Sequence, residues 1–300
     1  MRQALIVVAP RGQALPHKPL AETVEASGAR EMIFRDLGQA AESHAFELVF
    51  ETDGPAMSPD LSARLEDCAG HCDWALVPAA GRRKTLLICD MDSTVIGQEC
   101  LDELADFAGL KSEVAAITER AMRGELDFEG ALTTRVAMLK GLGLDALQRC
   151  FDARITLNPG ARTLVRTMQA NGAHTVLVSG GFTFFTSRVA RAAGFEAHRG
   201  NTLLDDGHAL TGQVGQPILG REAKLAALED ESAARGGPGN AIAIGDGAND
   251  LAMITAAGLG LAYDAKPVVA AEADAAIAAT DLRTALFFQG YAADTFVEAG

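Results

Sequence analysis

The segment Thr85–Thr94 reads TLLICDMDST, an apolar run that ends on the carboxylate of Asp90. A continuous apolar run of this length is typical of a strand that is buried on both faces of a parallel sheet. Asp92 follows two residues later, and two carboxylates this close would repel each other unless a cation lay between them. The segment therefore predicts a parallel sheet and a cation-dependent site at the end of its first strand.

Three further apolar runs follow along the chain, and each ends on small or polar residues. They are AHTVLVSGG (173–181), NAIAIGDG (240–247) and GLGLAYDA (258–265). Helical stretches separate the runs, which predicts an α/β fold with a doubly wound parallel sheet covered on both faces. In such sheets ligands bind beyond the carboxyl ends of the strands, so the residues at those ends are the candidates for chemistry.

Two segments are predicted to interrupt this core. Residues 97–153 have an almost wholly helical pattern, and because they directly follow the first strand we expect a helical-bundle cap over the site. Residues 195–215 carry Asp206-Gly207 between alternating segments, which predicts a β-hairpin. The expected cap helices lie near residues 100–107, 112–123, 128–140 and 145–151.

The first 80 residues have a different pattern of short strands and helices. Their order is strand, helix, strand, strand, helix, strand, which predicts a small α+β domain. Asp60 is the predicted N-cap of the second helix. The charged, glycine-containing segment 81–84 marks a boundary, so we expect one domain over 1–80 and another over 84–300. The predicted elements span 4–10, 20–27, 31–34, 46–51, 59–72 and 74–78.

Composition excludes several classes of partner. The formal net charge of −14 argues against nucleic acid, because phosphate backbones are bound by clustered Lys and Arg. No apolar run reaches the roughly 18 residues of a membrane span, so no membrane partner is expected. Five cysteines without a pairing pattern predict a reducing, cytoplasmic location. A phosphate ligand would need a locally positive site on this acidic chain.

The strand ends supply the groups that such a site requires. Asp246, Asn249 and Asp250 follow the third run, and their oxygen atoms together with those of Asp90 and Asp92 suit one Mg²⁺ ion. Ser179-Gly180-Gly181 ends the second run, where a hydroxyl and backbone N–H groups at a helix start can hold phosphate oxygens. Lys224 opens a helical segment after the predicted hairpin.

The order DxDST, SGG, Lys, GDGAND resembles the haloacid dehalogenase (HAD) superfamily, and within it the phosphoserine phosphatase family. The resemblance covers residue 84 to the C-terminus, and it depends most on three stretches. The resemblance implies a HAD-like Rossmannoid core with a cap, and Mg²⁺-dependent hydrolysis of O-phospho-L-serine to L-serine and phosphate, the last step of serine biosynthesis. The stretches are DMDSTVIGQECLDELA (90–105), GDGANDLAMITAAGLGLAYDAKP (245–267) and DLRTALFFQGY (281–291).

Catalytic roles are implied by the same resemblance. Asp90 would be the nucleophile that becomes an aspartyl-phosphate, and Asp92 would protonate the leaving seryl oxygen and then activate water. The Mg²⁺ ligands would be the Asp90 carboxylate, the Asp92 backbone carbonyl and Asp246. Ser179, the Gly180 amide and Lys224 would bind the phosphoryl oxygens. Asn249 would contact the substrate, and Asp250 would orient Lys224 or the surroundings of the metal.

Four cap residues match those that select the substrate in the family. Glu99 would meet the substrate ammonium and Arg135 its carboxylate, a group that Arg can bind in a bidentate way. Met122 and Phe128 would be the apolar cap residues. Read without the resemblance, Glu99 and Arg135 are ordinary surface charges, and Met122 and Phe128 ordinary core residues of a helical bundle.

The N-terminal part resembles an ACT-type regulatory module, which implies amino-acid binding and a homodimer formed through this domain. A purely structural domain is an equal alternative. Two alternatives for the whole chain also stay open: a HAD phosphatase or phosphotransferase for another small phosphomonoester such as phosphohomoserine, and a catalytically dead amino-acid-sensing regulator.

Overall fold

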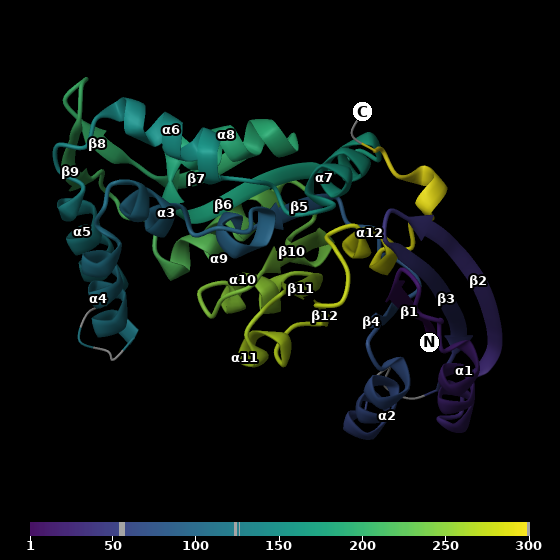
Figure 1. Cartoon of the computed structure of the whole chain (residues 1–300). Helices are drawn as coiled ribbons and strands as arrows, with labels where there is room; N and C mark the ends of the chain where they lie inside the picture. Colours follow the sequence, from purple (N-terminus) through teal and green to yellow (C-terminus); the bar gives the residue numbers. More distant parts are fainter. Residues whose placement is uncertain (54–57, 123–124, 126, 299–300) are drawn as a thin grey trace.

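A six-stranded sheet organises the larger part of the molecule. The structure is a computed structural model that describes residues 1–53, 58–122, 125 and 127–298. Strands lie in the order β12-β11-β10-β5-β6-β7, and every neighbouring pair is parallel (Figure 1). The strands are β5 (Leu86–Cys89), β6 (His174–Phe182), β7 (Ala197–Asn201), β10 (Ala241–Gly245), β11 (Leu259–Tyr263) and β12 (Ala275–Ile277).

The chain order within this sheet creates a switch point at β5. From β5 the chain adds β6 and β7 on one side, then returns to add β10, β11 and β12 on the other. Ligand sites in such sheets form where the order reverses, beyond the carboxyl ends of the strands. The doubly wound parallel core predicted from the apolar runs is therefore confirmed.

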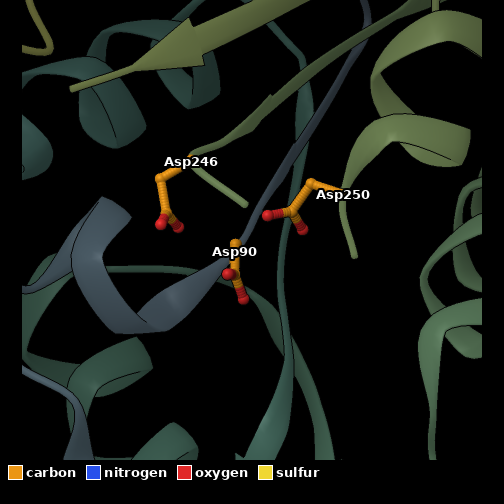
Figure 2. Close-up of side chains that lie close together, drawn as sticks. All are labelled: Asp90, Asp246 and Asp250. Carbon is orange, nitrogen blue, oxygen red and sulfur yellow. The ribbon is translucent and has the colours of Figure 1, made fainter. Parts of the chain in front are cut away.

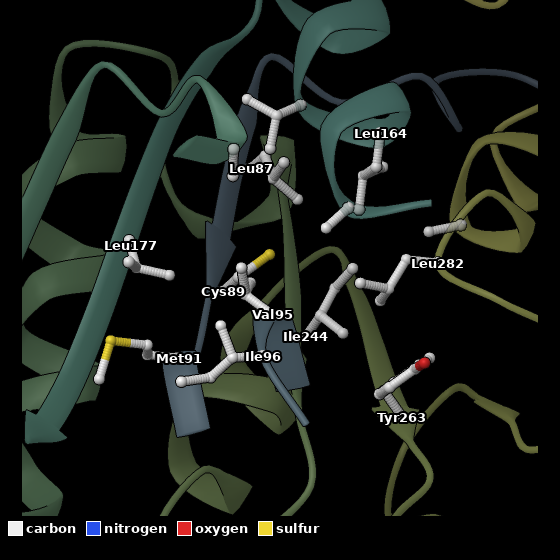
Figure 3. Packing of buried hydrophobic residues seen from close by; sticks show 14 of the residues in the cluster. Leu87, Cys89, Met91, Val95, Ile96, Leu164, Leu177, Ile244, Tyr263 and Leu282 are labelled. Atoms are coloured by element: carbon white, nitrogen blue, oxygen red, sulfur yellow. The ribbon is translucent and has the colours of Figure 1, made fainter. Parts of the chain in front are cut away.

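Helices cover both faces of the parallel sheet. One face packs against α7 and α8, and Figure 3 shows Leu87, Cys89, Leu177 and Ile244 in this layer with Leu164 of α7. The other face packs against α9 and α10. The helices of the core are α7 (Ala161–Ala170), α8 (Thr183–Ala193), α9 (Arg221–Ala233), α10 (Leu251–Ala256), α11 (Pro267–Ala270) and α12 (Thr284–Phe288).

A helical cap and a hairpin stand beside the carboxyl ends of the core strands. The hairpin turns at Asp206-Gly207, as predicted, and it joins the cap because Gly141 and Leu142 exchange backbone hydrogen bonds with Leu210. Buried residues hold each cap helix in place, and in α4 they are Val114 and Ile117. The cap elements are α3 (Cys100–Phe107), α4 (Lys111–Met122), α5 (Phe128–Met138), α6 (Leu144–Arg154), β8 (Leu203–Asp205) and β9 (Leu210–Val214).

The N-terminal residues form a separate antiparallel sheet in the order β2-β3-β1-β4, with α1 and α2 on one face (Figure 1). The predicted order of elements is correct, but the predicted N-cap is wrong. Ser58, not Asp60, caps α2, because its side chain accepts a 3.1 Å hydrogen bond from the Leu61 N–H. The elements are β1 (Arg2–Pro10), α1 (His17–Ala26), β2 (Arg30–Ala40), β3 (Ser43–Glu51), α2 (Pro59–Ala69) and β4 (Asp73–Pro78).

The second face of the N-terminal sheet is buried against the part of the chain that contains the parallel sheet. Ile6 and Val8 of β1 belong to the same hydrophobic cluster as Phe287 and Phe288 of α12. A polar contact joins the same two parts: Asp73 is buried and accepts hydrogen bonds from the loop after β12. No helix within the described ranges is both long and apolar enough to cross a membrane.

Candidate active site

Asp90 stands where β5 ends, at the switch point of the sheet. Its backbone N–H donates to the carbonyl of Ile244 on β10, so the two strands stay paired up to the site. The chain then turns tightly over Met91–Val95, and Ser93 adopts a left-handed φ of 56°. After this turn the carboxylate of Asp92 meets the N–H of Cys100 at the start of α3. The two acids therefore have different surroundings although they are two residues apart.

Three carboxylates converge at the edge of the sheet. Asp90, Asp246 and Asp250 each offer an oxygen atom, and these atoms lie within 4.8 Å of one another (Figure 2). Asp90 comes from β5, whereas the other two follow β10. Gly245 makes room for the cluster, because a Cβ at that position would lie 2.5 Å from the Cγ of Asp250.

Lys224 lies between two members of the cluster. Its Nζ is 2.8 Å from Oδ1 of Asp90 and 2.6 Å from Oδ1 of Asp250, and its side chain is only 3% exposed. With three carboxylates and one ammonium, the group carries a formal charge of −3 + 1 = −2. One divalent cation would neutralise it, and carboxylate oxygens are the ligands that Mg²⁺ prefers. The donor set therefore fits the predicted ion.

Burial dominates the electrostatics of this cluster. It raises the pKa of Asp90 well above its ordinary value; Lys224 opposes the increase, and the charges of Asp250 and Asp92 add to it. Burial would lower the pKa of Lys224, but the carboxylates of Asp90 and Asp250 outweigh it and raise that pKa. The pKa of Asp246 is also raised, first by burial and then by Asp250. Raised pKa values for Asp90, Asp246 and Lys224 are expected in a buried site with an excess of negative charge.

Asp92 is held by partners of its own. Its Oδ1 accepts a 2.9 Å hydrogen bond from the Cys100 N–H, and its Oδ2 accepts a 3.1 Å hydrogen bond from Ser179. Burial raises its pKa, although both hydrogen bonds oppose the increase. A carboxyl group with a raised pKa can carry a proton into a reaction, which suits a general acid. The Asp92 carboxylate lies outside the three-carboxylate cluster, so its predicted metal contact depends on the backbone carbonyl and stays a prediction.

Ser179, Gly180 and Gly181 lie near the end of β6, where the Ser179 hydroxyl meets Asp92. The Gly181 N–H donates a 2.8 Å hydrogen bond to the hydroxyl of Ser179, and that hydroxyl donates to Asp92. A Cβ on Gly181 would lie 3.0 Å from both the Asp92 carboxylate and the Ser179 hydroxyl. Glycine therefore allows the backbone to approach both acceptors closely.

Among the predicted cap residues, Glu99 is tied to the core. It accepts a 2.8 Å hydrogen bond from the hydroxyl of Ser93, in the turn that follows Asp90. Desolvation in the site, with the Asp92 charge as the next cause, raises the pKa of Glu99 to about 7, although part of the side chain faces solvent. Arg135 on α5 is near enough to Asp102 and Glu99 for their charges to favour its ionised form, while burial lowers its pKa.

Phe128 is the cap residue that touches the core. A Cβ on Gly180 would lie 3.2 Å from its ring, which is a tight contact, whereas one on Gly220 would lie at an ordinary contact distance of 3.6 Å. The ring is nevertheless 43% exposed. The side chain of Met122 lies outside the described parts of the structure. Asn249 is exposed beside the cluster, and Gly247 makes room for its amide.

Two supporting residues were not predicted. Thr94 donates a 3.2 Å hydrogen bond to Oδ1 of Asp246, and Asn158 donates a 2.8 Å hydrogen bond to the Thr94 carbonyl. Thr94 belongs to the quoted motif, so its position beside two acids was a usable signal. Asn158 gave no signal, because it joins the site from 64 residues away.

Comparison with known protein families and with individual proteins identifies relatives of this chain. Family models described as haloacid dehalogenase-like hydrolase match residues 87–255 and 233–282. A phosphoserine phosphatase of Polaromonas sp. is 48% identical over 198 residues, which cover 64% of this chain and 84% of the relative. A phosphoserine phosphatase of Archaeoglobus fulgidus is 43% identical over 202 residues, 67% of this chain and 58% of the relative. The chain thus spans less than two thirds of the archaeal relative's length.

Solved structures extend the likeness to the N-terminal sheet. The structure of a probable phosphoserine phosphatase from Vibrio cholerae, in unliganded form, has a TM-score of 0.75 and 30% identity. The match covers 97% of this chain and 88% of that chain. The whole arrangement of two sheets is therefore shared with a solved protein, while the family models begin at residue 87, so the ACT-type resemblance of the first 80 residues stays a prediction.

Proposed function

The chain belongs to the haloacid dehalogenase-like hydrolases, and on that premise we propose that it is a phosphoserine phosphatase. It hydrolyses O-phospho-L-serine to L-serine and phosphate as the last step of serine biosynthesis. The observation that carries the proposal is the position of Lys224 between Asp90 and Asp250, beside the third carboxylate of the cluster. A buried cation next to a strand-end nucleophile is the environment that phosphoryl transfer requires.

Asp90 is the proposed nucleophile. Its carboxylate attacks phosphorus, the bond from phosphorus to the seryl oxygen breaks, and an aspartyl-phosphate forms. Because its pKa is raised, the Asp92 carboxyl group can carry a proton, and it donates this proton to the leaving seryl oxygen. Asp92, now ionised, accepts a proton from the water that attacks the phosphorus atom, and release of phosphate regenerates Asp90. The Asp92 carboxyl group therefore takes part in both proton transfers of the reaction.

Phosphoryl oxygens are held by the groups that surround Asp90. The Ser179 hydroxyl and the Gly180 amide are supplied by β6, and the Lys224 ammonium is supplied by α9. Asp90, the Asp92 carbonyl and Asp246 would hold one Mg²⁺ ion, with Asp250 fixing Lys224. When bound, the ion supplies positive charge that offsets the repulsion between an anionic nucleophile and an anionic substrate.

Substrate selection is proposed for the cap. Glu99 pairs with the substrate ammonium, Arg135 with its carboxylate, and Phe128 closes the site over Gly180. Met122 is proposed as a further apolar contact, and Asn249 as a contact from the core side. Each charged group of phosphoserine thereby meets a residue of opposite charge.

Release of inorganic phosphate from L-phosphoserine, with and without Mg²⁺, tests the proposal. We expect Mg²⁺-dependent release that is abolished in Asp90→Asn, because the amide cannot act as the nucleophile. Equal rates on phosphoserine and phosphohomoserine would favour the broader phosphomonoesterase alternative. No release on any phosphomonoester, with wild-type and Asp90→Asn proteins alike, would favour the regulator.

Two further proposals concern the setting of the enzyme. Within the described structure all five cysteines are unpaired thiols, which supports a reducing, cytoplasmic location. Strand β2 is an edge strand with Ile33 and Phe34 about half exposed, which supports a homodimer through the N-terminal sheet. Light scattering on the purified protein tests the dimer, and a monomeric mass at micromolar concentration would contradict it.

A further inference from the structure

Asn201 is a buried amide that links the end of β6 to the segment before α9. It is the last residue of β7 and is only 2% exposed. Its Nδ2 donates to the carbonyl of Gly180 at 2.8 Å and to that of Leu219 at 3.1 Å. Its Oδ1 accepts from the Leu219 N–H at 2.7 Å. Both donors and the acceptor of the amide are thus used inside the protein.

The bond to Gly180 fixes the peptide that follows it. The carbonyl of Gly180 and the N–H of Gly181 belong to one planar peptide group, so they turn together. The Gly181 N–H of this peptide donates to the Ser179 hydroxyl, which in turn donates to Asp92. Asn201 therefore controls the orientation of a hydroxyl that it does not touch.

The bonds to Leu219 fix the start of α9. Leu219 precedes Gly220, the N-cap of the helix, and Lys224 is the fourth residue of that helix. Because Asn201 binds both the N–H and the carbonyl of Leu219, this residue can neither rotate nor slide along β7. The position of the Lys224 ammonium depends on where the helix begins.

Gly180 and Gly220 also form the surface beneath Phe128. A Cβ on either glycine would lie within van der Waals reach of its ring, and the two glycines come from the two segments that Asn201 joins. A shift of one loop against the other would therefore misplace the cap residue as well as the two groups that hold phosphate.

We propose that Asn201 is a positioning residue, which holds Ser179–Gly181 at the end of β6 and the start of α9 in one register for binding phosphate. The inference rests on the proposed phosphatase function. A side-chain amide is required, because Asp lacks the two N–H donors and Ser has only one donor and a shorter reach. The carboxylate of Asp would also face two carbonyl oxygens.

Asn201→Asp tests the proposal, with Gln289→Glu as its matched control. Gln289 is another fully buried amide that donates to one backbone carbonyl and accepts from one backbone N–H, at the junction with the N-terminal sheet. Both substitutions replace an NH₂ group by an oxygen atom. We expect Asn201→Asp to lower kcat/KM about 10–100-fold, since small displacements of positioned groups have effects of this size. Gln289→Glu should lose thermal stability but stay within about threefold of the wild-type kcat/KM.

Binding of inorganic phosphate gives a readout that does not require phosphoserine to be the substrate. Phosphate with Mg²⁺ should raise the melting temperature of wild type and Gln289→Glu, and the increase should be largely lost in Asn201→Asp. If Asn201→Asp does not fold, Asn201→Ser is measured instead, with the same expectation. A folded Asn201 variant with wild-type kcat/KM and a wild-type phosphate shift would overturn the proposal. A wild-type protein that binds phosphate but does not cleave phosphoserine would overturn only the proposed function.

Discussion

The Nζ of Lys224 lies 2.6 Å from Oδ1 of Asp250, and both side chains are almost wholly buried. Asp250 also belongs to the cluster of three carboxylates, so one residue serves the ammonium and the cation-binding group together. Its other oxygen accepts a 3.1 Å hydrogen bond from the Gly247 N–H, which fixes the carboxylate in the turn after β10. The position of the lysine is thereby set by the same residue that completes the acidic cluster.

Lys224→Met should separate catalysis from metal binding. The ammonium balances one of three carboxylates, so its loss changes the formal charge of the cluster from −2 to −3. We expect phosphate release to fall about 10²–10³-fold, the loss typical of removing a group that stabilises transition-state charge. Mg²⁺ should bind at least as tightly as to wild type, as measured by calorimetry. The exposed Lys111→Met is the control, and weaker Mg²⁺ binding in Lys224→Met would contradict this account.

Arg135→Ala should change the choice of substrate. A lost charge-assisted contact costs about 1.5–3 kcal/mol, so KM for phosphoserine should rise about 10–100-fold. Phosphoethanolamine has the same phosphate and ammonium but no carboxylate, and its KM should change less than threefold. Steady-state kinetics on both substrates measure the difference, with the exposed Arg149→Ala as control. Equal losses on the two substrates would argue against carboxylate binding by Arg135.

The sequence predicted the catalytic edge of the sheet because each central strand is an apolar run that ends on a reactive residue. Asp90, Ser179 and Asp246 all follow such runs, and parallel strands bring their ends together. Strand β12 was not predicted, and β7 was predicted only as part of the hairpin over 195–215, whereas it pairs with β6 in the parallel sheet. Ala197–Asn201 reads AHRGN, whose charge and glycine suit an edge strand that is only half buried. Pattern alone does not distinguish such a segment from a loop.

Contacts between distant segments explain what else could not be predicted. The direction of the Asp92 carboxylate depends on the left-handed Ser93 and on the Cys100 N–H. Phe128 reads as a core residue of a helical bundle, yet it lies on two glycines from other elements. Such contacts follow from packing in three dimensions, which hydrophobic periodicity does not specify.

Glu99 should give the reaction an acid limb near neutral pH. Only its ionised form attracts an ammonium group, and desolvation raises its pKa to about 7. For L-phosphoserine, kcat/KM should therefore fall as the pH falls through 7, or slightly below because the exposed part of the side chain is hydrated. The folded protein holds this proton more firmly than the unfolded chain does, so the contribution of Glu99 to stability is lost as the pH rises through the same range.

A pH profile with two substrates measures this limb. 3-Phosphoglycerate has a phosphate and a carboxylate but no ammonium, so its profile should lack the contribution of Glu99. In Glu99→Gln the profile for phosphoserine should come to resemble that for 3-phosphoglycerate. An unchanged acid limb in Glu99→Gln would assign the ionisation to another group.

Asp73 should hold the N-terminal sheet to the rest of the protein. It accepts hydrogen bonds from the N–H groups of Ala278 at 2.8 Å, Ala279 at 2.9 Å and Thr280 at 2.9 Å, and another from the Thr280 hydroxyl. In Asp73→Asn the amide would turn an N–H toward one of these donors and lose the negative charge that strengthens the others. We expect the free energy of unfolding to fall by about 2–4 kcal/mol.

Urea denaturation measures this loss, and the exposed Asp60→Asn on α2 is the control, which should change the free energy by less than about 0.5 kcal/mol. Asp73 contacts none of the proposed catalytic groups, so kcat at 25 °C should stay within about twofold of wild type while the folded state persists. Two explanations of how the N-terminal sheet is attached predict different urea midpoints for Asp73→Asn. If the N-terminal sheet is held mainly by Ile6, Val8 and α12, Asp73→Asn and Asp60→Asn will unfold at the same urea concentration. If the buried carboxylate is the main attachment, only Asp73→Asn will unfold earlier, because three backbone N–H donors then lose their negatively charged acceptor.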